Sequence, residues 1–76
     1  MIVETYGRLT DLLPASFEWH AETITLVQFK TALSKTYPLL SKENFVIAVN
    51  NQIQHNDAFI IHNSDAIALM PPFSGG

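Results

Sequence analysis

The sequence predicts a single α+β domain in which one helix covers one face of a mixed sheet of four or five strands. Two observations support this prediction. Segments rich in β-branched and aromatic residues flank one clear helical segment, in the order strand, strand, helix, strand, short strands, strand. The 76 residues also suffice for only one small core. A hairpin followed by a helix and further strands is typical of this class.

The first two strands are expected near the start of the sequence. Residues 2–6, IVETY, combine β-branched and aromatic side chains, as strands do. Residues 16–21, SFEWHA, alternate between apolar and polar side chains, which is typical of a half-buried strand. The segment between them is bounded by glycine and proline and is expected to be a loop with room for one turn. We therefore expect the two strands to pair as a hairpin.

The helix has the clearest pattern in the sequence. Thr25 is a favourable N-cap, and Gln28 three residues later completes a capping-box pattern. Pro38 ends the segment because the residue before a proline is disfavoured in the α conformation. Apolar residues recur at helical spacing between these limits, at Leu26, Phe29, Leu33 and Tyr37. The sequence thus predicts a helix over residues 26–36.

Three strand segments are expected directly after the helix. Residues 45–50, FVIAVN, form a continuous apolar run of strand length, so this strand should be buried on both faces. The pair Asn50-Asn51 suits a turn because asparagine tolerates positive φ. The segments QIQ, residues 52–54, and AFII, residues 58–61, are then expected to be short strands.

The last strand, AIALM at residues 66–70, should have two unequal faces. Its larger side chains are expected to face the core, and these are Ile67 and Leu69. The other side chains would leave a shallow, apolar outer face, formed by Ala66, Ala68 and Met70.

Composition and charge exclude several classes of function. The chain has no cysteine, which excludes disulfides, thiolate metal sites and chemistry on a side-chain thiol. Its four basic residues are scattered and the net charge is −3, which argues against nucleic acid as a partner. No apolar run approaches the roughly 20 residues that span a membrane, and the first residues lack a signal-peptide pattern. The expected location is the cytoplasm, with no membrane partner.

The polar side chains do not form a recognisable active site. The histidines His20, His55 and His62 lack metal-ligand spacing and are expected at the surface. The seven carboxylates are spread singly and are interpreted as solvated charges, although Glu4 and Glu18 on neighbouring strands could face each other. There is no Gly-x-Ser-x-Gly motif and no glycine-rich phosphate loop. We therefore expect no metal, no bound cofactor and no catalysis by this chain alone.

The glycines are concentrated at the end of the sequence. Two of the three are Gly75 and Gly76, and a chance Gly-Gly pair there has a probability of roughly 0.5%. The prolines of the preceding MPPFS stretch favour an extended path, and glycines without Cβ fit a narrow channel. We therefore predict a domain over residues 1–70 and an extended tail over 71–76. Such a tail suits a carboxylate that is activated as a mixed anhydride in a partner's active site.

Three stretches carry a resemblance to a known family. IAVNNQIQ followed by DAIALMPPFSGG is similar to the β-grasp sulfur carriers of the MoaD/ThiS type, and the N-terminal YGRLTDLL resembles the same family. The resemblance spans essentially the whole chain and is strongest to the MoaD-type small subunits of molybdopterin synthase. It implies a ubiquitin-like β-grasp fold. The sequence departs from the family pattern at Thr10, at Asn63-Ser64-Asp65, at Met70 and at Phe73, and it keeps the Gly-Gly end.

The resemblance implies a sulfur-transfer cycle at Gly76. An E1-like adenylyltransferase of the MoeB type would use ATP to adenylate this residue, and sulfur would convert its carboxyl group to a thiocarboxylate. The large subunit of molybdopterin synthase, of the MoaE type, would receive the tail. There the sulfur would pass to precursor Z (cyclic pyranopterin monophosphate) in molybdenum cofactor biosynthesis. The large subunit would supply the catalytic side chains, in a heterotetramer of two small and two large subunits.

The partner surface is expected around the base of the tail. Aromatic residues and methionine beside prolines are good anchors at interfaces, although Met70 and Phe73 could instead cover the end of the core. The residues assigned to this surface are Ala66, Ala68, Met70, Pro71, Pro72, Phe73 and Ser74. The chemistry is assigned to Gly76, with Gly75 beside it.

Three alternative functions stay open. A ThiS-like carrier for thiamine or another thio-compound belongs to the same family, but such chains commonly lack the Pro-Pro pair. A ubiquitin-like protein modifier would also end in Gly-Gly, but after a tail that contains arginine. The last alternative is a plain binding module in which the Gly-Gly end has no role.

Overall fold

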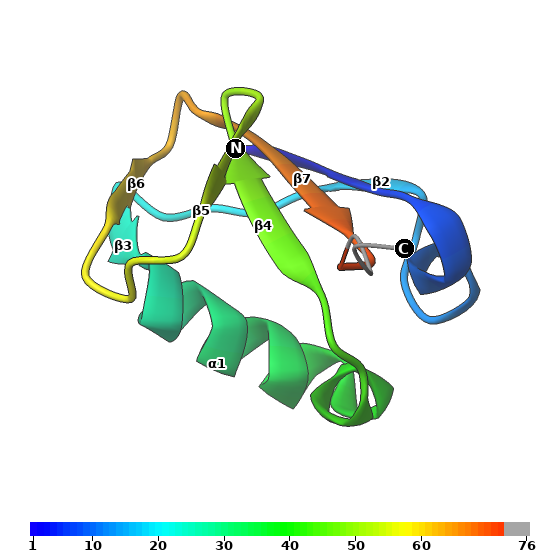
Figure 1. Cartoon of the computed structure of the whole chain (residues 1–76). Coiled ribbons are helices and arrows are strands. Elements are labelled where there is room, and N and C mark those ends of the chain that lie inside the picture. The colour runs from blue at the N-terminus through cyan, green and yellow to red at the C-terminus, as the bar shows by residue number, and fades with distance from the viewer. Residues whose placement is uncertain (73–76) are drawn as a thin grey trace.

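The structure is a computed structural model that describes residues 1–72. The chain forms a five-stranded mixed sheet, with the helix α1 (Leu26–Thr36) packed across one face and a separate two-stranded sheet beside the start of the helix (Figure 1). The prediction of an α+β fold with one main helix is confirmed.

The five strands lie in the order β2, β1, β7, β4, β5. Strands β1 and β7 are parallel, and every other neighbouring pair in this sheet is antiparallel. Segments from opposite ends of the sequence therefore lie side by side in the middle of the sheet (Figure 1). The strand bounds are β1 (Ile2–Thr5), β2 (Ser16–Glu18), β4 (Val46–Val49), β5 (Gln52–Gln54) and β7 (Ala66–Met70).

The expected hairpin of the first two strands is present, with a shorter second strand. In its register Glu4 lies opposite Ser16 and Ile2 lies opposite Glu18, so the two glutamates are diagonal neighbours and do not pair directly. The connection contains the 3₁₀ helix η1 (Gly7–Asp11), which is longer than the single turn expected there.

The helix begins and ends where the sequence predicts. The Thr25 hydroxyl accepts a hydrogen bond from the Gln28 backbone N–H at 3.3 Å, and the Gln28 side chain accepts one from the Thr25 N–H at 3.0 Å. This reciprocal capping box fixes the first turn. A second 3₁₀ helix, η2 (Pro38–Lys42), follows and buries Leu40. The sequence pattern did not indicate η2.

The two-stranded sheet was missed in part. It pairs β3 (Thr23–Thr25) with β6 (Ile60–His62), whereas the sequence pattern indicated no strand at residues 23–25 and a strand at 58–61. Each strand has only three residues, and the partners come from distant parts of the chain. Their pairing depends on tertiary contacts, such as the hydrogen bond from the Leu26 N–H to the Phe59 carbonyl, and local pattern gives no signal for it.

The turn between β4 and β5 has the conformation that the sequence predicts. Asn50 and Asn51 have φ values of 51° and 69°, in the left-handed region that asparagine tolerates. Strand β4 is buried on both faces at Ile47, Ala48 and Val49, also as expected.

The core lies between α1 and the sheet. The helix contributes three fully buried side chains, which pack against buried side chains of β1, β4 and β7. Trp19 packs edge-to-face on Phe29, with ring centroids 5.6 Å apart. The largest buried side chains are Val3, Leu9, Leu26, Phe29, Leu33, Leu40, Ile47, Ile61, Ile67 and Leu69.

Over residues 1–72, no helix is both long enough and apolar enough to cross a membrane.

Candidate functional site

Strand β7 positions the base of the predicted tail. It is hydrogen-bonded on one edge to β1 and on the other to β4, and it ends at Met70, directly before Pro71. Ile67 and Leu69 are buried on the side of the core, as predicted. Ala66 is exposed and Ala68 and Met70 are half-buried, so the expected shallow outer face is present. Its role as a partner surface stays a prediction.

An apolar hollow lies where β7 meets the tail. Its volume is about 380 Å³, and it is lined by Tyr6, Met70, Pro71 and Pro72. Three of these residues belong to the predicted partner surface. Apolar hollows of this kind seat the anchor side chains of a partner.

Tyr6 is the residue of this hollow that the sequence did not indicate. It follows β1, the residue is 47% exposed, and its backbone N–H donates to the Leu69 carbonyl at 3.0 Å. This bond continues the parallel ladder between β1 and β7. The pairing joins opposite ends of the sequence, so no local pattern could have placed Tyr6 beside Met70.

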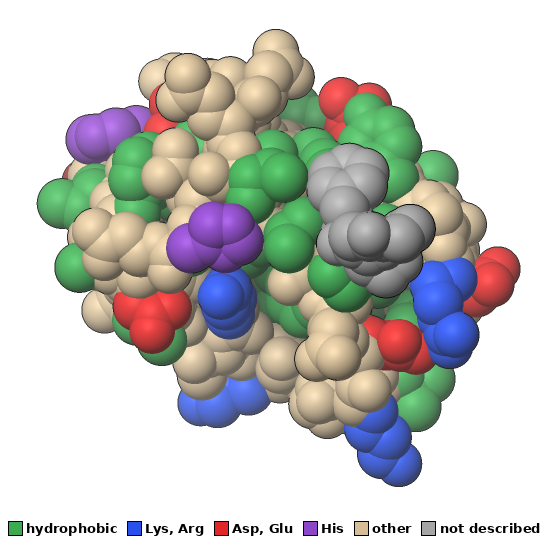
Figure 2. Space-filling view, in the orientation of Figure 1, with side chains coloured by type: hydrophobic (Ala, Val, Ile, Leu, Met, Phe, Trp, Pro, Cys, Tyr) green, Lys and Arg blue, Asp and Glu red, His purple; other side chains and the backbone are tan. Residues whose placement is uncertain are grey.

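Beside Ala68, the outer face of the sheet is apolar toward β4 and carries a carboxylate toward β1. In register across the sheet, Ala68 has Glu4 of β1 on one side and Ala48 of β4 on the other, and Ile53 of β5 lies beyond Ala48. Ile53 is 39% exposed. On the side of the molecule that Figure 1 presents, exposed hydrophobic side chains lie among charged and polar ones (Figure 2).

Near the tail base, one ion pair links two loops. The Arg8 guanidinium of η1 donates to Glu43, which follows η2, at 2.7 Å. The Arg8 side chain is 69% exposed. Solvent screens such a pair, so it adds little to stability.

A polar cluster fixes the opposite end of β7. The Asp65 carboxylate accepts the His62 backbone N–H at 2.8 Å and the Asn50 side-chain amide at 3.0 Å. The same Asn50 side chain accepts the Ala66 N–H at 3.0 Å. The hydrogen bond from His62, followed by that from Asn50, holds the pKa of the Asp65 carboxyl below its ordinary value. This cluster joins the two turns that precede and flank β7.

The remaining titratable residues do not converge. All three histidines are exposed, as predicted. Over residues 1–72, no group of three His, Asp or Glu side chains is placed to hold a metal ion. The view of all carboxylates as simple solvated charges was wrong for two of them, because Glu43 and Asp65 are half-buried and make the specific contacts described above.

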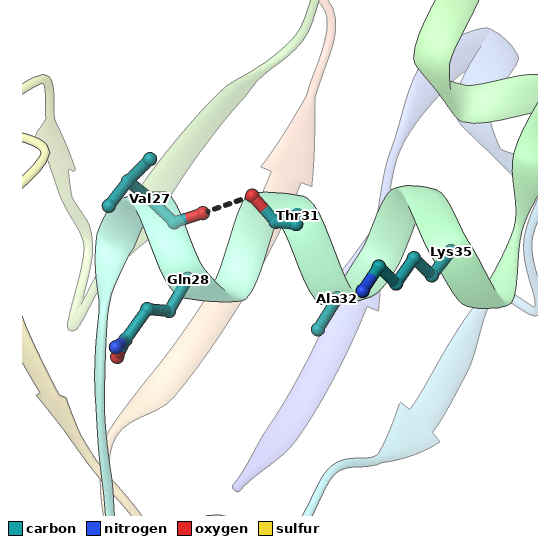
Figure 3. A pocket seen from close by; sticks show the side chains of 5 residues that line it. All are labelled: Val27, Gln28, Thr31, Ala32 and Lys35. Carbon is teal, nitrogen blue, oxygen red and sulfur yellow. Dashed lines mark hydrogen bonds between the residues drawn. The ribbon is translucent and has the colours of Figure 1, made fainter.

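A second hollow, of about 300 Å³, lies along the outer side of α1. Figure 3 shows its lining side chains on successive turns of the one helix. The only hydrogen bond drawn there joins the Thr31 hydroxyl to the Val27 carbonyl at 2.9 Å, within the helix itself. Its one charged group is Lys35, so the hollow lacks the convergent polar groups of a binding site. The full lining is Val27, Gln28, Thr31, Ala32 and Lys35.

The end of the tail lies outside the described residues. The assignments made to Phe73, Ser74, Gly75 and Gly76 therefore stay predictions. The described residues determine where the tail leaves the domain and what surrounds its base.

Comparison with protein families gives a match over nearly the whole chain. The ThiS family matches residues 3–76, a span that includes both the sheet and the Gly-Gly end.

Several solved structures share the fold. SAMP1 from Haloferax volcanii is 17% identical and matches with a TM-score of 0.74 over 99% of this chain and 97% of that chain. A putative molybdopterin converting factor subunit 1 from Pyrococcus furiosus is 15% identical, with a TM-score of 0.77 over 93% and 94%. A complex of subunits 1 and 2 of molybdopterin-converting factor from Helicobacter pylori matches at 24% identity, with a TM-score of 0.69 over 99% and 96%. These likenesses establish the ubiquitin-like β-grasp fold that the resemblance implied.

Proposed function

The chain belongs to the ThiS family of small β-grasp sulfur carriers, and from this premise we propose that it carries sulfur on the carboxyl group of Gly76. The supporting observation is that the family match runs to residue 76 on a domain whose central strand leads directly into Pro71 and Pro72. A strand held on both edges gives the tail a fixed base. The two prolines limit the backbone freedom that a partner would otherwise have to restrict on binding.

The proposed chemistry takes place at the terminus and needs no side-chain thiol. A Gly76 carboxylate oxygen attacks the α-phosphorus of ATP in the active site of an E1-like adenylyltransferase, and pyrophosphate leaves. Sulfide (HS⁻) delivered by the sulfur source then attacks the acyl-adenylate carbon, and AMP leaves. The product is a thiocarboxylate. The chain has no cysteine, so its sulfur would be held at this one position.

More specifically, we propose the role of small subunit of molybdopterin synthase. The Pro-Pro pair at the tail base and the likeness to converting-factor subunits support this choice. The Helicobacter pylori neighbour is a complex with subunit 2. For this chain we propose a corresponding MoaE-like large subunit, which would supply the catalytic side chains, and a MoeB-like activating enzyme. The sulfur would pass to precursor Z.

Intact-mass analysis tests the proposal. The chain is incubated with the E1-like enzyme, ATP and a sulfur source, and a species in which sulfur replaces one terminal oxygen is expected. Deleting Gly76 should abolish this species, whereas the control variant His55→Ala, at an exposed residue outside the predicted partner surface, should retain it. If wild-type chain never gains sulfur while the same enzyme loads a known carrier, the proposal is wrong.

Protein modification is the second candidate function. It is favoured by the likeness to SAMP1 from Haloferax volcanii and to the small archaeal modifier protein 1 (SAMP1) from Methanosarcina acetivorans. The second of these matches with a TM-score of 0.73. A modifier would form isopeptide bonds between Gly76 and lysines of other proteins. Mass spectrometry of cell extracts separates this function from sulfur carriage, because only a modifier would give lysine adducts derived from the tail. A third outcome is tested by a pull-down: capture of a thiazole synthase would indicate a ThiS-like carrier.

A further inference from the structure

Gly7 is the one glycine among residues 1–72, and it lies against the base of the tail. It follows Tyr6 at the end of the β1–β7 ladder, and its φ of +61° is in the left-handed region. Its carbonyl accepts a hydrogen bond from the Thr10 hydroxyl at 2.8 Å, which fixes the first turn of η1. The backbone at position 7 is therefore held in place on two sides.

The absent side chain of Gly7 leaves the space that Pro71 occupies. A Cβ atom at position 7 would lie 2.8 Å from Cγ and 3.1 Å from Cδ of Pro71. Carbon atoms in contact normally stand about 3.5–4.0 Å apart. The proline ring closes on its own backbone nitrogen, so Cγ cannot swing aside as the end of a flexible side chain would. Any side chain at position 7 would therefore move the Pro71 backbone.

We propose that Gly7 is a positioning residue that sets the direction in which the tail leaves the domain. The Pro71 ring packs on the bare backbone of Gly7, and a displacement of Pro71 is passed to Pro72, which follows it. This inference rests on the proposed function for its consequence, because only a tail that must reach a partner's active site needs a set direction. A shift of about 1 Å at a reacting group can lower a rate by up to a hundredfold.

Two requirements act on Gly7, and the test must separate them. The positive φ alone would strain alanine at this position. Asn51 provides the matched control, because its φ is 69° and its turn lies beyond the opposite end of β7. The variant Asn51→Ala introduces the same kind of backbone strain without touching Pro71. The double variant Gly7→Ala/Pro71→Ala removes the ring atoms and keeps the strain.

NMR spectroscopy tests the contact without any sulfur chemistry. The wild-type chain should show nuclear Overhauser effects between the Gly7 Hα atoms and the Pro71 ring protons. In Gly7→Ala, chemical shifts should change most at Pro71 and Pro72, while core methyl groups such as those of Leu33 stay in place. Absence of the Gly7–Pro71 effects in the wild type, or unchanged shifts at both prolines in Gly7→Ala, would overturn the proposal.

Kinetics of adenylation test the consequence. With the E1-like enzyme and ATP, Gly7→Ala should lower kcat about tenfold and change KM less than about threefold, because the domain surface other than the two prolines stays in place. Asn51→Ala should match the wild type. In the Pro71→Ala background, Gly7→Ala should cost less than about twofold.

The outcomes distinguish the two proposals. An equal loss in Asn51→Ala, or no rescue in the Pro71→Ala background, would show that strain and not contact is responsible, and would overturn the role of Gly7. If the wild type is never adenylated, the proposed function fails, and the NMR comparison alone decides whether Gly7 positions Pro71.

Discussion

The two ends of β7 are held by different forces. At its start, Asp65, Asn50 and His62 form hydrogen bonds of 2.8–3.0 Å that join two turns. At its end, Met70 and the two prolines meet Tyr6 around an apolar hollow. The hydrogen-bonded end satisfies its own polar groups and leaves little for a partner to bind. Among residues 1–72, the apolar end leaves exposed surface that is available to a partner. We infer that the first serves stability and the second serves recognition, and the following predictions test that division.

Truncating a core side chain of β7 itself should lower the stability of the whole domain, and with it both ends of the strand. Leu69 is fully buried between the sheet and α1. We expect Leu69→Ala to lower the free energy of unfolding by about 3 kcal/mol, since it deletes buried methyl groups and leaves a cavity. Chemical denaturation measures this change. A loss below about 1 kcal/mol would mean that β7 is not the centre of the core.

Truncating the aromatic side chain at the apolar end should affect binding and not folding. Tyr6 is 47% exposed and lines the hollow. We expect Tyr6→Ala to weaken binding to the large subunit by about 2 kcal/mol, or roughly 30-fold in Kd. The melting temperature should stay close to that of the wild type. Titration calorimetry measures the affinity, and the matched control is Val27→Ala on α1, at a residue that is 44% exposed. Unchanged affinity would place the interface elsewhere.

Removing the carboxylate at the polar end should have the opposite effect. We expect Asp65→Ala to lower the free energy of unfolding by about 1 kcal/mol at neutral pH and to leave adenylation unchanged. The folded-state pKa of Asp65 is lowered, chiefly by the hydrogen bond from His62. Its contribution is therefore complete above the ordinary aspartate pKa of about 4 and is lost as the pH falls through the folded value.

Denaturation of wild type and Asp65→Ala between neutral and acidic pH checks this pH dependence. The two unfolding free energies should converge as the pH falls. A constant difference at all pH values would mean that hydrogen bonds to the charged carboxylate are not the cause.

The smallest effect is expected at the ion pair near the tail. The Arg8 side chain is 69% exposed, so solvent screens its bond to Glu43. We expect Arg8→Ala to change the free energy of unfolding by less than about 0.5 kcal/mol. A larger loss would show that this pair helps to hold the loops around the tail base. The apolar end of β7 would then contribute to stability as well as to recognition.

Local signals explain which parts of this structure were predictable. The limits of α1 follow from Thr25 and Gln28 at its start and Pro38 after its end, each of which acts on residues close to it in the sequence. The turn at Asn50 and Asn51 is equally local. The buried face of β7 follows from the alternation of its own side chains.

Features that depend on distant pairing were not predictable in this way. The parallel pairing of β1 with β7 brings Tyr6 and Gly7 to the tail base, and it joins segments from opposite ends of the sequence. The β3–β6 pair has the same character. For the candidate site, the sequence therefore identified Met70 at the end of β7 and the two prolines that follow it. It did not identify Tyr6 and Gly7, which follow the neighbouring strand β1.

The central place of β7 also has a consequence for how the protein is made. The first hairpin emerges from the ribosome early and the β4–β5 hairpin later, but they cannot join until the strand between them has been synthesised. Pairing between such distant segments is slow compared with local hairpin or helix formation. The strand that completes the sheet is also the one that leads into the tail. Cellular enzymes that recognise the tail together with its base would therefore encounter it only on chains that have finished folding.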